Sequence, residues 1–401
     1  MPVKHKVSES QLFLEGIDEM EASDYYKDSY QRTFLDDYDF LHFLRDREEN
    51  ACWLRSKSNE IRVAALEKHT YETDSIISEY ANMGKKGVIE DTLRNTSLYV
   101  TVNDIDYPVR SCAVKTILER ARISGNALQK VKKPVLAQIL NYCLHVAKGD
   151  ALLRVLEDKV SAVHGGDNME YAILEAPELF LRIKEYLDSH FPGNTFAGAS
   201  YDHSLMSASW ELTGQDDMVK AYKDALKHND IYIDDIQPAL RFSTSDVGVC
   251  GANLYPSLVA GNDQRIITLG SPLRLEHKAG ASLDKFQEQL GFIYSLYTQA
   301  VKQLADLLSI EIINPINCLI GVMKRIGIPK KLAFSAIDLF KAQSGDDPCT
   351  AHDLYYGICE VIFMKQCEGA SGSQLAKVEE DVARALSIRW HNYDLPGEIK
   401  W

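Results

Sequence analysis

Long apolar runs are missing from this 401-residue chain. No stretch approaches the roughly 18 uninterrupted apolar residues of a membrane-spanning helix. Lys4 and Lys6 stand near the start of the chain, but no apolar segment follows them, which argues against a secretory signal. The eight cysteines are scattered and form no C-x-x-C pair, a pattern typical of reduced thiols. We therefore expect a cytoplasmic protein without a membrane segment.

Motifs for metal binding and catalysis are missing as well. The eleven histidines form no H-x-x-x-H or H-E-x-x-H pattern. Cys349 and Cys359 flank His352, but their spacing is nearly three helical turns, so one helix cannot bring both thiols to one ion. The glycines of 246–251 lack the lysine and hydroxyl of a phosphate-binding loop, so a β-bulge or turn explains them better. We predict no metal, no cofactor and no catalytic residue.

Positive charge is scarce: 58 acidic residues face 44 Lys and Arg residues, for a formal net charge of −14. Such a balance disfavours attraction of the whole molecule to nucleic acid or anionic lipid. The acidic excess is concentrated in residues 1–50, which hold 13 acids and 6 bases and are rich in Tyr and Phe. We interpret 1–58 as a solvated acidic arm. Alternatively, this arm docks on a basic surface of the same chain or of a partner protein.

One stretch has the opposite charge. Residues 101–150 hold 8 bases and 4 acids, and between 110 and 133 a single acid, Glu119, opposes the cations. These cations are Arg110, Lys115, Arg120, Arg122, Lys130, Lys132 and Lys133. One interpretation is a solvated face that balances the acidic remainder. The functional interpretation is a stripe of nucleic-acid-binding residues that follows phosphates.

Two further features bear on the functional interpretation of this stretch. Tyr99 and Tyr107 lie just upstream and could stack on bases. At about 100° per residue, only part of the cationic set shares one helix face. Smaller basic clusters occur elsewhere in the sequence, at Arg265, Arg274, His277 and Lys278, and at Lys324, Arg325, Lys330 and Lys331.

The order of predicted elements indicates an α+β fold. Runs of strands come first and runs of helices later, unlike the alternation of a βαβ protein. We expect a mixed, mainly antiparallel sheet domain over 59–280, followed by a helical C-terminal bundle over 281–401. Strands are predicted at 61–66, 98–102, 152–156, 159–163, 171–174, 196–201, 205–212, 239–244, 247–254 and 264–276. Helices are predicted from Pro108 onward and at 134–147, 177–190, 316–326, 330–341, 349–366 and 373–385.

Residues 283–313 are predicted to form one long helix. Phe286, Leu290, Ile293 and Tyr297 recur at spacings of four, three and four, which places them in one apolar seam. A helix cannot bury such a seam alone. We expect the seam to pack inside the same chain, because the short Gly- and Pro-containing connections favour antiparallel neighbours. An oligomer interface is the alternative.

Three segments carry a resemblance to a known family. They are 152–174 (LLRVLEDKVSAVHGGDNMEYAIL), 240–280, which contains S-D-V-G at 245–248 and H-K-A-G at 277–280, and 351–401. Together they resemble a family encoded by phages and plasmids, whose domain is catalogued as the domain of unknown function number 932, over about 105–401. The chain departs from that pattern at Thr244, where the family has asparagine, and at Lys278-Ala279, where it has one residue. A C-x-N-G motif expected after Leu258 is also missing.

The resemblance implies an accessory protein of a mobile genetic element and supplies no established active site. Our leading hypothesis is a non-catalytic protein that binds single-stranded DNA in recombination or annealing, and this hypothesis includes a homo-oligomer. The link to annealing proteins is an analogy of fold alone. A second hypothesis is an anti-defence protein that binds and inhibits a host protein, and an enzyme of unrecognised type is the third. A continuous basic groove would favour DNA, whereas an acidic surface without one would favour a protein partner.

Overall fold

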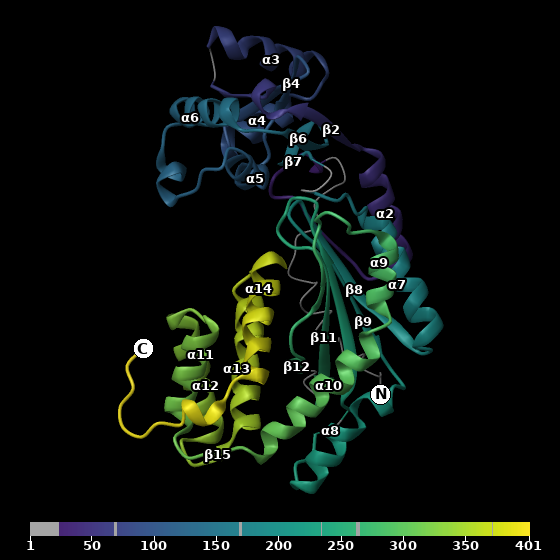
Figure 1. The fold of residues 1–401 in the computed structure, drawn as a ribbon, viewed down its shortest axis with the longest axis vertical. Coiled ribbons are helices and arrows are strands. Elements are labelled where there is room, and N and C mark those ends of the chain that lie inside the picture. The colour runs from purple at the N-terminus through teal and green to yellow at the C-terminus, as the bar shows by residue number, and fades with distance from the viewer. Residues whose placement is uncertain (1–23, 68–69, 168–170, 234, 262–264, 371) are drawn as a thin grey trace, which may run out of the picture.

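A seven-stranded antiparallel sheet forms the centre of the larger lobe (Figure 1). In this computed structural model, the described residues are 24–401 except 68–69, 168–170, 234, 262–264 and 371. The strand order is β1-β8-β9-β10-β11-β12, and β13 also pairs with β11. The strands are β1 (Gln31–Phe34), β8 (Asn194–Asp202), β9 (Met206–Leu212), β10 (Gln237–Thr244), β11 (Ala252–Ala260), β12 (Arg265–Thr268) and β13 (Leu273–Leu275).

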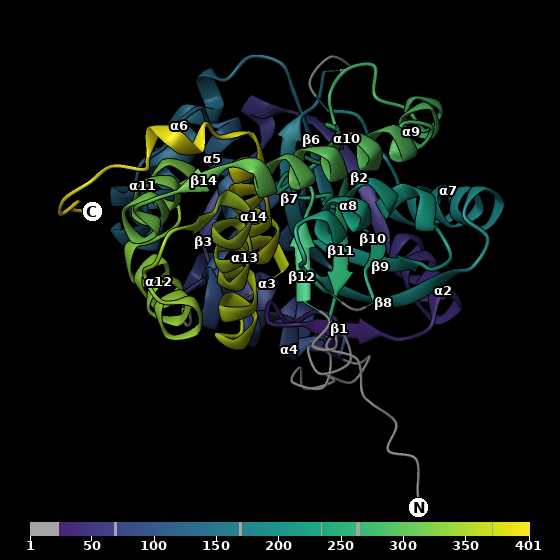
Figure 2. The ribbon, with the colours of Figure 1, turned by 90° about the horizontal axis from the view of Figure 1, so that it is seen from below.

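Helices cover both faces of this sheet because successive side chains of a strand point to opposite faces. Leu240 and Phe242 are fully buried on one face, where Phe242 meets Phe286. The helices of this side are α2 (Asp37–Glu49), α7 (Ala176–His190), α8 (Asp216–His228), α9 (Leu283–Leu290) and α10 (Ile293–Asp306). The other side holds α13 (Ala351–Cys367) and α14 (Gly372–Ala383), with α11 (Pro315–Ile326) and α12 (Lys330–Ser344) outside them (Figures 1 and 2). A two-stranded ladder of β14 (Glu311–Ile312) and β15 (Cys349–Thr350) joins α11 to α13.

The smaller lobe contains two three-stranded antiparallel sheets. One is β2 (Ala51–Lys57), β6 (Asp150–Leu156) and β7 (Lys159–Gly165), and the other is β3 (Arg62–Ala65), β4 (Leu98–Val102) and β5 (Ile105–Pro108). Its helices are α3 (Tyr71–Asn82), α4 (Lys86–Asn95), α5 (Ala113–Arg120) and α6 (Lys133–Val146). In the β6–β7 hairpin, Glu157 and Asp158 both have positive φ, 49° and 60°. This is the backbone of a type I′ turn, whose twist matches that of the strands even without glycine.

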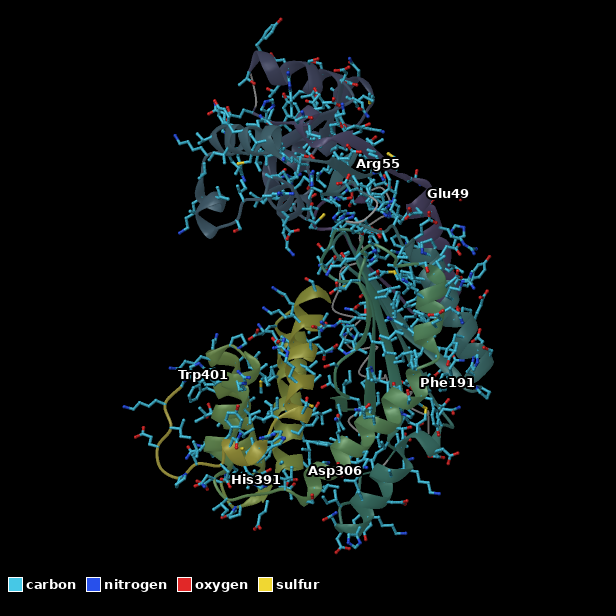
Figure 3. All side chains as sticks on the ribbon, in the orientation of Figure 1. Glu49, Arg55, Phe191, Asp306, His391 and Trp401 are labelled. Atoms are coloured by element: carbon cyan, nitrogen blue, oxygen red, sulfur yellow. The ribbon has the colours of Figure 1, made fainter. Side chains whose placement is uncertain are left out.

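The two lobes give the ribbon the outline of a letter C (Figure 1). They join on the side of α2, near the labelled Glu49 and Arg55 in Figure 3. On the opposite side, α5 and α6 of the smaller lobe stand apart from α11, α12 and α14 of the larger lobe (Figure 1). We call this the open side of the molecule.

The α+β class and the helical C-terminal region are as predicted, but several elements differ from the sequence analysis. Residues 24–57, expected within an acidic arm, contribute β1, α2 and β2, because Tyr30, Phe40 and Leu44 are buried in the core. Residues 171–174 form no strand. The strand expected at 247–254 begins only at β11, and 264–276 divides into β12 and β13 around Gly270, whose φ is 68°.

The predicted helix 283–313 is two α-helices, a 3₁₀ helix (Leu307–Ser309) and the short strand β14. The chain turns at Gly291 and Phe292, so α9 and α10 follow different parts of the sheet. The apolar seam continues across the break: Phe286, Leu290, Ile293 and Tyr297 are each 0% exposed within one chain. This places the seam in the intramolecular core.

Candidate functional site

The cationic stretch 110–133 divides into buried and exposed side chains. Arg110 is 1% exposed, and its guanidinium donates to the carbonyl oxygens of Tyr26 (3.2 Å) and Leu156 (3.3 Å). Asp28 lies 3.8 Å from the same guanidinium. Arg110 therefore anchors the segment before β1 to the smaller lobe and does not face solvent.

Arg120 is the second buried member of the set. Its Nε donates to Ser58 Oγ at 2.7 Å, and Nη2 donates to the carbonyl oxygen of Lys148 at 2.5 Å. These bonds join the end of α5 to the segments that flank β2 and β6. Arg110 and Arg120 thus serve packing in this conformation, and the predicted stripe loses two of its phosphate-binding candidates.

The other five cations lie at or near the surface. Lys115, Arg122, Lys130 and Lys132 are exposed and Lys133 is half-buried. They are distributed from α5 through a short 3₁₀ helix (Asn126–Lys130) to the start of α6. Lys115 forms an exposed ion pair with Glu119 at 3.7 Å. We call these five residues the upper cluster.

A second basic cluster occupies the turn between α11 and α12. Lys324, Arg325, Lys330 and Lys331 are all exposed, and residues 324–331 include no acid. Gly327 has a φ of 93° and ends α11 in a left-handed conformation, which lets α12 begin three residues later. We call these four residues the lower cluster.

The two clusters belong to opposite lobes but flank the same open side. Figure 1 shows α5 and α6 above this side, and the turn between α11 and α12 below it. Figure 2, seen from below, also places α11 in line with α5 and α6. In Figure 3, which draws the side chains, a clear space remains between these elements. Segments far apart in the sequence thus present positive charge to one region.

Two exposed aromatic rings belong to helices of the two lobes. Tyr142 of α6 is 80% exposed, and Phe363 in the second half of α13 is 50% exposed. The tyrosines singled out from the sequence lie differently: Tyr99 is buried in β4, and Tyr107 is half-buried in β5. Tyr142 and Phe363 are therefore more accessible from solvent than Tyr99 and Tyr107.

A stack of aromatic side chains lies where the two lobes meet. The rings of His164 and Tyr171 are parallel at 3.9 Å, and Tyr171 lies 5.3 Å from His277. His277 Nδ1 is 3.1 Å from the carbonyl oxygen of Ala172, so this nitrogen carries the proton and donates. Its Nε2 then accepts from Thr244 Oγ1 at 3.2 Å.

This stack brings together the segments that carry the family resemblance. His164 belongs to 152–174, while Thr244 and His277 belong to 240–280. Burial lowers the pKa of His164 to about 4 and also lowers the pKa of His277, so both imidazoles are neutral near pH 7. Thr244 is 1% exposed. The arrangement packs the lobes together and does not present Thr244 to solvent as a nucleophile.

Buried ion pairs reinforce the same junction. Lys159 of β7 is fully buried and donates to Asp28 at 3.1 Å and Asp91 at 2.6 Å. Arg154 of β6 donates to Glu48 of α2 at 2.7 Å and lies 3.0 Å from Asp246, which follows β10. The bonds to Asp28, Glu48 and Asp246 connect the smaller lobe to segments of the larger one, whereas Asp91 belongs to α4 of the smaller lobe.

The described side chains offer no cluster of metal ligands. Across the described residues, no three His, Cys, Asp or Glu side chains gather where an ion could be held. Cys359 is buried and His352 Nε2 is bonded to the Tyr222 hydroxyl at 2.7 Å. Among the residues that the structure describes, no helix has the length and apolarity needed to cross a bilayer.

Sequence reasoning found both basic clusters but not their relation. Charge density along the chain identified 110–133 and 324–331, whereas the burial of Arg110 and Arg120 depends on partners far away in the sequence. Only the fold brings the remaining cations to one side. No family model, curated protein or solved structure matches this chain.

Proposed function

We propose that this protein binds single-stranded nucleic acid on its open side, with the upper and lower clusters contacting phosphates. The observation that carries the proposal is the position of two exposed cationic clusters, from opposite lobes, on the same side of an acidic molecule. Each phosphate that a Lys or Arg side chain neutralises releases a counterion and adds salt-dependent affinity. A strand crossing the open side would gain such contacts at both ends.

The exposed aromatic rings favour a single strand over a duplex. Unpaired bases can stack on Tyr142 and Phe363, whereas the bases of a duplex have their faces covered by neighbours. The negative charge of the rest of the molecule repels phosphates and confines them to the basic side. A role in recombination or annealing for a phage or plasmid fits the resemblance of the sequence.

The test is fluorescence anisotropy of a labelled oligo(dT), titrated with the full chain at several salt concentrations. Replacing Lys130, Lys132 and Lys133 with Ala should reduce the slope of log affinity against log salt by about 0.7 per lost contact. Replacing the four lower-cluster residues should reduce it in the same way. The matched control replaces Lys220, Lys223 and Lys227 of α8, which lies away from the open side (Figure 1), and should keep the slope.

Three outcomes decide the proposal. A slope reduced by both cluster variants and preserved by the α8 control supports it. An unchanged slope in folded cluster variants removes those residues from the site. No binding of oligo(dT) by the unmodified chain at low salt contradicts the proposal and leaves the protein-binding hypothesis in its place.

A further inference from the structure

A cavity of about 120 Å³ lies between the central sheet and α14, and it is partly open to solvent. The register of the sheet explains why this space is not filled by side chains. Ala239 of β10 pairs with Glu211 of β9 on one side and with Ser257 of β11 on the other. Paired residues point to the same face, so two small side chains lie next to one another beneath α14. The space that larger residues would fill stays empty.

One side of the cavity carries an arginine whose charge the protein already balances. Arg241 lies one step along the same face of β10 and pairs with Tyr255, whose ring is 4.2 Å from the guanidinium carbon. The guanidinium also forms an ion pair with Glu379 of α14. This pairing makes the cavity a poor anion site, because an incoming anion would compete with Glu379.

Glu211 lies on the other side of the cavity and is half-buried there. The charged side chain that acts on its carboxylate is another acid, Asp235. Burial raises the pKa of Glu211, and the nearby Asp235 raises it further. The carboxylate therefore lies in a partly desolvated site beside another negative charge. A bound cation would stabilise its charged form.

We propose that this cavity binds a small organic cation with one flat ring, whose amidinium or ammonium group pairs with Glu211. The size fits one ring, since a cavity of roughly 150 Å³ in another protein accommodates benzene. The walls fit the ring as well, because most of the lining is apolar and includes Val259, Ile266 and Ala383. A charge-assisted hydrogen bond to Glu211 would fix the orientation of the ligand.

The experiment uses benzamidine as the probe in isothermal titration calorimetry on the full chain, with benzyl alcohol as the neutral probe. We expect one benzamidine per chain with a Kd of about 1 mM or tighter, and weaker binding of benzyl alcohol. Glu211→Gln should weaken benzamidine binding about tenfold or more, since it removes the charge and keeps the shape. Glu185→Gln, at an exposed position on α7, is the matched control and should bind as the unmodified chain does.

A second variant tests the location independently of the charge. Ala239→Leu fills the hollow and should abolish binding of both probes, with circular dichroism confirming the fold. If that variant does not fold, Ser257→Leu fills the same space from β11. The proposal is wrong if the unmodified chain gives no saturable heat up to about 10 mM benzamidine. It is equally wrong if Glu211→Gln binds benzamidine unchanged, or if a folded filled variant still binds.

Discussion

Burial decides what a charged residue does in this protein. Arg110 and Arg122 come from the same basic stretch, yet Arg110 is 1% exposed and bonded to backbone carbonyls, whereas Arg122 is exposed. The two terminal nitrogens of the Arg110 guanidinium donate to backbone carbonyl oxygens, and the side chain is enclosed by the protein, so a phosphate in solution cannot reach it. The sequence shows both residues as equal cations, because the partners of Arg110 come from distant segments.

Burial also sets the pH response of the histidines at the lobe junction. His164 has a pKa of about 4, and desolvation lowers the pKa of His277 and of His203 as well. An unfolded histidine has a pKa of about 6.5. Between the folded and the unfolded pKa values, these histidines are therefore protonated in the unfolded chain and neutral in the folded chain. The contribution of these imidazoles to stability is full above about pH 6.5 and is lost as the pH falls toward 4.

We predict that His164→Gln flattens this pH dependence. At pH 5 the lowered pKa of His164 should account for about 2 kcal/mol of the stability that the unmodified chain loses relative to pH 7.5. Urea unfolding at both pH values measures the loss, which should be smaller by about that amount in the variant. His228→Gln, an exposed position on α8, should keep the full loss. Equal losses in His164→Gln and the unmodified chain would contradict the assignment.

Elements were predictable where local periodicity matches burial. The helix α6, the helix α7 and the β6–β7 hairpin lie close to their predicted positions because their apolar spacing is regular. The helices α2 and α8 were missed, although Phe40, Leu44, Met218 and Tyr222 are buried at helical spacing. Their many charged residues make the apolar face difficult to recognise without knowing which side packs.

The break between α9 and α10 shows the limit of a periodic pattern. The seam keeps its spacing through Gly291, and the pattern alone cannot distinguish a continuous helix from two helices that bury the same residues. What the pattern did predict is the burial of Leu290, which is 0% exposed and lies in the main core.

We predict that Leu290→Ala lowers the free energy of unfolding by about 2–5 kcal/mol, because it removes a fully buried side chain and leaves a cavity. Chemical denaturation measures this cost. Leu395→Ala, at a position that is 49% exposed, should change stability by less than about 0.5 kcal/mol. Light scattering should show the same molar mass for both variants and the unmodified chain. A Leu290→Ala protein that keeps its stability but loses an oligomeric state would show that the seam faces another subunit.

The arrangement of the strands and lobes in the whole molecule was the feature least predictable from the sequence. The central sheet takes β1 from the N-terminal region and its other strands from 194–275, and the two small sheets likewise combine distant segments. Such pairings depend on contacts that no local pattern records. The candidate interface depends on them entirely, because the upper and lower clusters flank the same open side only when the two lobes are placed.

Charged contacts contribute to holding the lobes in that placement, together with the aromatic stack of His164, Tyr171 and His277. Arg154 of β6 is 4% exposed, and its guanidinium lies 5.0 Å from the ring of Trp53 in the same lobe. It also reaches two carboxylates of the larger lobe, Glu48 and Asp246. Removing one partner of a buried ion pair leaves the other charges uncompensated, which typically costs 3–5 kcal/mol. Here the loss of stability would weaken the contact between the two lobes.

We predict that Arg154→Met uncouples the lobes. Differential scanning calorimetry of the unmodified chain should show one main unfolding transition, and the variant should show two, with the earlier one lowered by the lost contact. Adding Glu48→Gln to Arg154→Met should recover part of the loss, because it removes one of the two stranded carboxylates. Lys85→Met breaks an exposed 2.6 Å ion pair with Asp158 inside the smaller lobe, and should cost less than about 1 kcal/mol with a single transition. If Arg154→Met also unfolds in a single transition at an unchanged temperature, the lobes are held by their apolar contacts, and the charged junction serves another purpose.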